Sequence, residues 1–374
     1  MNNKNKKIYL MRPTIGKDEL KLVKQVIESG QITEGPVTDE LEKVTAHYIG
    51  SKHAIVCSSA TTGLELALRA LKIGTGDEVI IPDFTHPATA LAVMTVGATP
   101  VLIDVNVNTC TVDAERIESA ITPKTKAVIP VSIFGIPLDM DSINDVKQKY
   151  ALPIIEDAAC SLGSEYKRKK IGSLADISVF SFHPRKIFTT GDGGLLTTNN
   201  DQWNQHIRSM KSFGFSKTKE GALEFIQWGT NYRMSEILSA VALGQIRRID
   251  TILHDRITKA HIYDNLLSEI EEIYIPGAHV DSSRNFQTYI IYLKRPDIRD
   301  RIIEEMRTLN IQTQIGTYAL HLQPFFKNLN RIGTLENSLK LYNQLLSLPL
   351  HHQLTYRDQK KVIAALIKML AKNI

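Results

Sequence analysis

Short apolar segments with the composition of β-strands alternate with segments of helical period between residues 53 and 198. HAIVCSS precedes TGLELALRAL, DEVIIPD precedes ATALAVMTV, and TPVLIDV precedes DAERIESAI. When strands and helices alternate, each helix returns the chain across one face of the sheet, so that neighbouring strands run parallel. The pattern predicts an α/β fold with a mostly parallel sheet, helices on both faces, and ligands beyond the carboxyl ends of the strands.

The alternation ends near Asp250. The remaining sequence contains an isolated strand (FQTYIIYLK), a helical segment (DIRDRIIEEMRTLN) and a terminal helix from Thr355. This order is typical of a smaller α+β domain. We therefore expect a large cofactor-binding domain over residues 1–250 and a small C-terminal domain over residues 251–374.

One helix is expected before the first strand, in PTIGKDELKLVKQVIESG. Its spacing places Leu20, Val23 and Ile27 on one face, and Gly30 is a suitable C-terminal glycine. The small domain is a candidate surface for the N-terminal helices to pack on.

Composition argues against several classes of partner. Lys and Arg number 45 against 40 Asp and Glu, and the basic runs at 4–7 and 167–170 contain no interleaved aromatic residues, so we expect no nucleic acid. No apolar run approaches the roughly 18 residues of a membrane helix. Cys57, Cys110 and Cys160 lack the spacing of zinc ligands or of a disulfide framework. We expect a cytoplasmic protein with no metal site and no membrane partner.

Polar residues follow several of the predicted strands. Asp157 ends the strand PIIED, and Lys186 lies beyond the strand ISVFSF. SSATTG, after HAIVC, offers hydroxyl groups and free backbone N–H groups at a helix N-terminus, which favours a phosphate. PDFTHPATA delivers the ring of His86 to the same edge. A phosphate site, an aromatic ring, an aspartate and a lysine are the groups that pyridoxal phosphate requires, since lysine forms a Schiff base and aspartate keeps the pyridine nitrogen protonated.

From Pro13 to the C-terminus the chain resembles the DegT/DnrJ/EryC1/StrS sugar aminotransferases. The motifs that carry the resemblance are GQITEGPVTDELE, SSATTGLELALRAL, GDEVIIPDFTHPATA, IIEDAACSLGSEY, SFHPRKIFTTGDGG, TNYRMSEILSAVALGQ and SLPLHHQLT, in that order. The resemblance implies the type I fold of aspartate aminotransferase, with a seven-stranded sheet in the large domain. It also implies a homodimer with shared active sites.

The resemblance implies roles for individual residues. Lys186 matches the Schiff-base lysine, and Asp157 matches the partner of the pyridine nitrogen. Ala60, Thr61 and Ser181 match phosphate-binding positions, and His86 takes the ring-stacking position, where relatives more often have Trp, Phe or Tyr. Asn231 matches an asparagine that reaches the phosphate from the neighbouring subunit. The candidates for substrate binding are Arg233, Tyr318 and His321, although His321 can equally be structural.

The implied reaction is a pyridoxal-phosphate-dependent transamination from L-glutamate to a keto group of a nucleotide-linked deoxysugar, in polysaccharide or glycan precursor biosynthesis. The alternatives are a small phosphorylated ketone as acceptor, a sugar dehydratase, and a non-catalytic regulatory member of the family. Dehydratases of the family replace the lysine by histidine, so Lys186 argues against that alternative. Cys160 stands where relatives have Gln or His.

Overall fold

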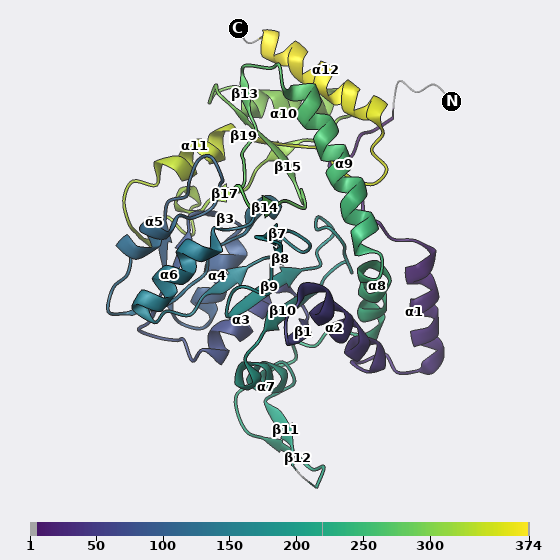
Figure 1. Cartoon of the computed structure of the whole chain (residues 1–374), viewed down its shortest axis with the longest axis vertical. Coiled ribbons are helices and arrows are strands. Elements are labelled where there is room, and N and C mark those ends of the chain that lie inside the picture. The colour runs from purple at the N-terminus through teal and green to yellow at the C-terminus, as the bar shows by residue number, and fades with distance from the viewer. Residues whose placement is uncertain (1–5, 219, 373–374) are drawn as a thin grey trace.

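The computed structural model describes residues 6–218 and 220–372, and Lys4 of the first basic run lies outside them (Figure 1). The large sheet contains, in spatial order, β4 (Thr99–Ile103), β2 (Glu78–Pro82), β5 (Thr125–Val128), β6 (Ile155–Asp157), β9 (Ile177–Ser181), β10 (Gly194–Thr198) and β1 (His53–Cys57). Two isolated bridges, Val128 to Ile154 and Val131 to Asp157, join the halves of the sheet between β5 and β6. Among these seven strands β10 alone is antiparallel to its neighbours. The mostly parallel seven-stranded sheet is confirmed.

Both faces of this sheet are covered. Ile55 and Val56 on β1 belong to different clusters of buried apolar residues, as do Ile80 and Ile81 on β2, because successive strand residues point to opposite faces. One face is covered by α3 (Ala60–Ala70), α4 (Pro87–Thr95) and α7 (Asp201–Met210). The other is covered by α2 (Pro36–Ile49), α5 (Ala114–Ser119), α6 (Met140–Tyr150) and α8 (Glu236–Ile246). Apolar runs without polar alternation are the expected sequence of such two-sided strands.

The first helix, α1 (Lys17–Ser29), packs on α8 at the flank of the molecule (Figure 1). Two residues of the predicted apolar face point outward, since Leu20 is 70% and Ile27 59% exposed, and the third, Val23, is half-buried. The buried residues of the helix are Glu19 and Val26. Glu19 binds Arg248 at 2.5 Å and occupies the space above Gly244, where a Cβ atom would lie 2.9 Å from its carboxylate. The inner side of α1 therefore combines this ion pair with the buried Val26 and the partly buried Leu22, whereas Leu20 and Ile27 stay exposed.

The C-terminal part contains an antiparallel sheet of β13 (Ile273–Tyr274), β15 (Tyr289–Leu293), β19 (Leu345–Leu348) and β16 (Gln314–Ile315). The helices α9 (Ile249–Leu267), α10 (Arg299–Thr308) and α12 (Tyr356–Lys372) pack with it around a third apolar cluster. The N-terminal segment joins this part, because Ile8 bridges Ile311 and the Leu350 N–H donates to the Leu10 carbonyl at 3.0 Å.

Residues 318–331 return to the large sheet. β17 (Tyr318–Ala319) pairs with β3 (Phe84–Thr85), and β18 (Asn330–Arg331) extends the sheet beside β4. The 3₁₀ helix Leu320–Leu322 follows β17, and α11 (Glu336–Gln344) leads into β19. The chain thus crosses between the two parts several times, and the boundary near residue 250 stays a prediction.

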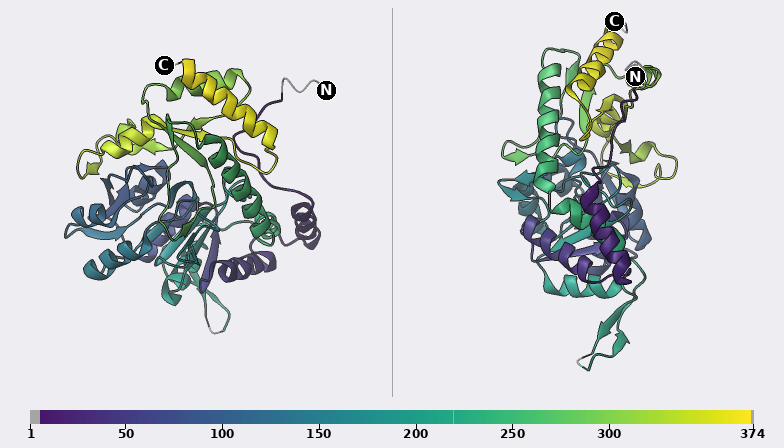
Figure 2. Two further views of the ribbon diagram at one scale, coloured as in Figure 1. Left: turned by 45° about the horizontal axis from the view of Figure 1, so that its top comes forward. Right: turned by 90° about the vertical axis from the view of Figure 1, so that its right-hand side faces the viewer.

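Two further small sheets are present. One contains β14 (Ser282–Ser283), β7 (Glu165–Tyr166) and β8 (Lys169–Lys170). The other is the hairpin of β11 (Phe215–Lys217) and β12 (Leu223–Phe225), which projects from the body of the molecule and is here called the arm (Figure 2). None of the helices in the described part of the chain combines the length and apolar character that crossing a membrane requires.

Candidate active site

Lys186 lies in the turn that joins β9 to β10. The Lys186 N–H donates to the His183 carbonyl at 2.9 Å, and the Thr189 hydroxyl donates to the Phe182 carbonyl at 2.6 Å. Gln245 of α8 holds the turn by two hydrogen bonds. Its amide oxygen accepts from the Thr189 N–H at 3.0 Å, and its amide nitrogen donates to the Thr189 carbonyl at 2.8 Å. The turn is fixed at both ends, and the half-buried Lys186 amine lies 3.1 Å from the Cys160 sulfur.

Asp157 ends β6, the parallel neighbour of β9. Its carboxylate is 5% exposed and accepts from the Thr89 hydroxyl at 2.8 Å and from the Ala159 N–H at 3.2 Å. Thr89, which was not predicted from the sequence, is fully buried in α4, and its hydroxyl lies 3.1 Å from that of Thr85. A threonine in the first turn of a helix after a strand is the signal that could have identified it.

The neighbouring carboxylate, Glu156, points elsewhere because strand residues alternate in direction. It is fully buried and accepts from the hydroxyl groups of Ser132 and Ser178. Burial raises the pKa of Glu156 to about 6. Of the two acids that end PIIED, Asp157 is the one that shares its surroundings with α4 and the lysine turn.

His86 caps α4, its Nδ1 accepting from the Ala88 N–H at 3.2 Å. The ring lies on the open side of the site, with the Tyr318 ring edge-on at 6.3 Å. The surrounding protein atoms lower the pKa of His86 by removing water from the ring, the positive charge of Lys186 lowers it further, and Asp157 acts in the opposite direction. His86, Lys186 and Asp157 therefore lie within one electrostatic neighbourhood, and the ring is neutral near pH 7.

Gly194 lies between Ser181 and the N-terminus of α3, and its lack of a side chain allows their close approach. Ser181 pairs with Gly194 between β9 and β10. A Cβ atom at Gly194 would lie 2.5 Å from the backbone carbon of Ser59 and 2.6 Å from the nitrogen of Ala60. Ser59 caps the helix, its hydroxyl accepting from the Thr62 N–H at 3.2 Å. The backbone of Ala60 and the exposed Thr61 are thus brought beside Ser181, where the positive end of a helix dipole favours an anion.

Asn231 and Arg233 follow the arm. The Tyr232 carbonyl between them accepts from the Ser58 N–H at 2.8 Å, which ties this loop to the start of α3. The Asn231 side chain is exposed, and the Arg233 guanidinium lies over the Phe213 ring at 5.0 Å. Among the described residues no hydrogen bond or ion pair joins either side chain to Lys186, Asp157 or Ser181.

His321 and Tyr318 differ in their surroundings. His321 is held by the fully buried Asp83, whose carboxylate lies 2.6 Å from its Nδ1 and accepts its backbone N–H at 2.8 Å. Tyr318 remains 38% exposed beside His86. Tyr318 is therefore free to meet a ligand, whereas the Nδ1 side of His321 already has a structural partner. Within residues 6–218 and 220–372, no three His, Cys, Asp or Glu side chains are arranged to hold a metal ion.

Residues 13–367 match the model of the DegT/DnrJ/EryC1/StrS aminotransferase family. The chain belongs to this family. It is 36% identical to GDP-perosamine synthase of Caulobacter vibrioides, over 97% of this chain and 98% of that one. It is 34% identical to the spore coat polysaccharide biosynthesis protein SpsC of Bacillus subtilis, over 94% of both chains. The PLP-form of Spr1654 from Streptococcus pneumoniae superposes with a TM-score of 0.92 at 28% identity, covering 99% of this chain and 100% of that one.

The family membership makes this protein a pyridoxal-phosphate-dependent aminotransferase of the type I fold. The residues at the sheet edge fit that cofactor. Asp157 is a buried carboxylate whose direction is fixed by Thr89, Lys186 is a primary amine beside it, and His86 is a neutral aromatic ring open on one side. Ser181 and the α3 N-terminus form the anion-binding corner that a phosphate requires.

We predict that Gly194→Ala weakens cofactor binding, because the added methyl group collides with the backbone of Ser59 and Ala60 and must push the first turn of α3 away from Ser181. Overpacking of this kind costs about 1–3 kcal/mol, so the Kd for pyridoxal phosphate should rise about tenfold to a hundredfold. The measurement is an absorbance titration of the cofactor-free protein. Gly277→Ala is the matched control, since Gly277 has open space around it; equal Kd values for the two variants would contradict the prediction.

Proposed function

We propose that this aminotransferase moves the amino group of L-glutamate to a keto group of a nucleotide-linked deoxysugar, in the biosynthesis of a cell-surface polysaccharide or glycan precursor. The observation that carries the proposal is the end-to-end match to GDP-perosamine synthase, combined with an intact Lys186 and Asp157 at one sheet edge. The similarity to SpsC supports the polysaccharide context. A cytoplasmic location stays a prediction.

The residues of the site divide the work of transamination. Pyridoxal phosphate, when bound, supplies an electron sink for the carbanion that forms at the substrate carbon. Asp157, held by Thr89, is a carboxylate in a buried position where it would stabilise a protonated ring nitrogen. Lys186 would hold the cofactor through Nζ. Once a substrate amine has released it, the same Nζ would accept the proton that leaves the donor α-carbon. His86 covers one side of the site, and Ser181 with the α3 N-terminus retains the phosphate.

The chemistry separates this proposal from the alternatives. A dehydratase of the family would carry histidine in place of Lys186. A regulatory member would bind the cofactor without consuming glutamate. The wild-type protein should convert glutamate to 2-oxoglutarate, and a screen of nucleotide-linked ketosugars and small phosphorylated ketones, followed by mass spectrometry, should then yield an aminated nucleotide sugar.

We also propose a homodimer whose active sites are shared. The support is exposed apolar surface on the described residues. It includes Leu20 and Ile27 on α1, and Phe225 (74% exposed) and Ile226 (60% exposed) on the arm and at its base. Asn231 and Arg233 follow this surface directly in the sequence. In a twofold dimer built on it, each of them is available to the neighbouring site.

Lys186→Ala should abolish both the violet absorption of the loaded protein and the conversion of glutamate. Lys186→Arg should fail as well, because a guanidinium does not lose its proton to become a nucleophile. Borohydride reduction of the wild type should fix the mass of the cofactor on the peptide that contains Lys186. Recovery of a borohydride-fixed adduct from Lys186→Ala would refute the assignment.

Asp157→Asn keeps the shape of the side chain but removes its charge. We expect the cofactor to stay bound while the half-reaction with glutamate slows by at least about a hundredfold, the usual weight of one buried electrostatic contact. Single-turnover absorbance measurements test this. Glu156→Gln is the matched control, because it neutralises the adjacent carboxylate, which binds Ser132 and Ser178 instead, and its rate should stay close to that of the wild type.

The shared site predicts that two inactive variants rescue each other. Lys186→Ala and Arg233→Ala, refolded together in equal amounts, form mixed dimers with one doubly damaged site and one intact site. Random pairing makes half of the dimers mixed, so activity should return to roughly a quarter of wild type. An inactive mixture in which mass measurement shows the mixed dimer would rule out sharing while leaving the role of Lys186 untouched.

A further inference from the structure

Arg185, the residue before Lys186, has a free cationic head group. Its side chain is exposed, and within the described part of the chain its guanidinium makes no hydrogen bond, ion pair or ring contact. Its backbone is held firmly, because the Gln287 amide donates to the Arg185 carbonyl at 2.6 Å. The anchored backbone fixes the position of the residue, and the unpaired guanidinium keeps its N–H donors for an anion.

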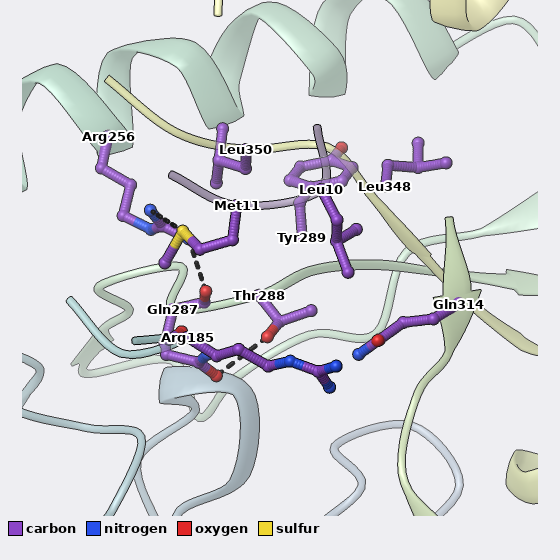
Figure 3. Close-up of a pocket in the computed structure, with 10 residues that line it drawn as sticks. All are labelled: Leu10, Met11, Arg185, Arg256, Gln287, Thr288, Tyr289, Gln314, Leu348 and Leu350. Atoms are coloured by element: carbon purple, nitrogen blue, oxygen red, sulfur yellow. Dashed lines mark hydrogen bonds between the residues drawn. The ribbon is translucent and has the colours of Figure 1, made fainter. Parts of the chain in front are cut away.

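Arg185 lines a small pocket at the meeting of the two parts of the chain. Figure 3 shows its side chain extending beneath the pocket toward the amide of Gln314 on β16. The cavity volume is about 30 Å³, which is room for one or two water-sized groups. The lining residues include two arginines and no acid: Leu10, Met11, Arg185, Arg256, Gln287, Thr288, Tyr289, Gln314, Leu348 and Leu350.

The two arginines have different tasks. Arg256 is 7% exposed, and its guanidinium donates hydrogen bonds to the carbonyls of Phe286 and Gln287. It therefore fixes the segment from which Gln287 reaches the lysine turn. Arg185 is left as the lining cation with unused donors, opposite a neutral amide that can both donate and accept.

Arg185 connects the pocket to the lysine turn. Arg185 adjoins Lys186 in the chain, and its charge is among those that lower the pKa of His86, after loss of water and Lys186. Gln314 lies four residues before Tyr318, whose ring faces His86. An amino donor bound at Lys186 must place its α-amine at the Lys186 position, so its carboxylates come within a few bonds of the same point.

We propose that Arg185 and Gln314 form the binding site for a carboxylate of the amino donor. The inference rests on the proposed glutamate-dependent transamination. A guanidinium fork matches the two oxygens of a carboxylate, the cavity accepts one such group, and no acidic side chain lines it to oppose the charge. A phosphate of the acceptor offers similar oxygens, but a nucleotide diphosphate is far larger than this cavity.

The test compares Arg185→Gln with the wild type, both loaded with cofactor. The probe is glutarate, a dicarboxylate that lacks the amine and cannot react. We expect calorimetric titration to show a Kd for glutarate raised about ten- to a hundredfold, the usual effect of removing a charged hydrogen-bond partner. Arg307→Gln, at an exposed arginine on α10, is the matched control and should bind glutarate as the wild type does. Gln314→Glu, which places an acid opposite Arg185, is a second variant and should weaken glutarate binding similarly.

Kinetic measurements separate the two sources of the anion. In Arg185→Gln the glutamate concentration needed for half-maximal rate should rise by a similar factor, while the rate at saturation, the cofactor absorption and the half-reaction with the acceptor stay close to wild type. Unchanged glutarate and glutamate affinities overturn the proposal, and a defect confined to the acceptor half-reaction overturns it in favour of a phosphate. Failure of the wild type to consume glutamate would instead refute the proposed function, and glutarate binding is measured independently of it.

Discussion

The active-site edge depends on one reversal of direction in an otherwise parallel sheet. β9 and β10 are joined by a turn instead of a helix, so the residues between them stay at the carboxyl end of β9. β6 ends at the same edge, which brings Asp157 beside the lysine turn. β1 resumes the parallel direction on the far side of β10, and its end delivers the N-terminus of α3. Lysine, carboxylate and anion-binding corner are therefore neighbours as a consequence of strand order, not of sequence proximity.

The C-terminal part of the chain contributes to that edge through backbone contacts. Asn285, fully buried, donates to the carbonyls of Cys160 and Leu162 at 2.9 Å, and Gln287 donates to that of Arg185. These contacts fix the segments that carry the Cys160 sulfur and the Lys186 amine. Motion of this part relative to the sheet would thus be transmitted to the lysine turn. The link also explains why the pocket beside Arg185 is formed by residues from both parts.

Local patterns in the sequence predicted the strands, the helices and the edge where Asp157 and Lys186 lie, because strand and helix periods are visible over a few residues. The contacts that fix the side chains of the site could not be predicted from the sequence. Asp83 binds His321 across 238 residues, and Thr89 reaches Asp157 from another element. The closeness of Gly194 to Ser59 likewise exists only after β10 is placed beside β1. Such pairs depend on tertiary approach, for which a single sequence carries no periodic signal.

The exposed Leu20 and Ile27 of α1 bear on the proposed homodimer. Spacing places Leu20 and Ile27 on the apolar face of the helix, yet the side that packs on the protein carries the Glu19–Arg248 pair and Val26. A buried ion pair contributes little net stability, whereas covering an exposed Leu or Ile side chain is worth about 1.5–3 kcal/mol. Covering Leu20 and Ile27 is therefore a gain that the proposed homodimer would make available. The same holds for the apolar arm, and the loop that follows the arm carries Asn231 and Arg233. In the proposed homodimer, association through these surfaces would bring the side chains of that loop to a neighbouring site, so that assembly and completion of the site would be the same step.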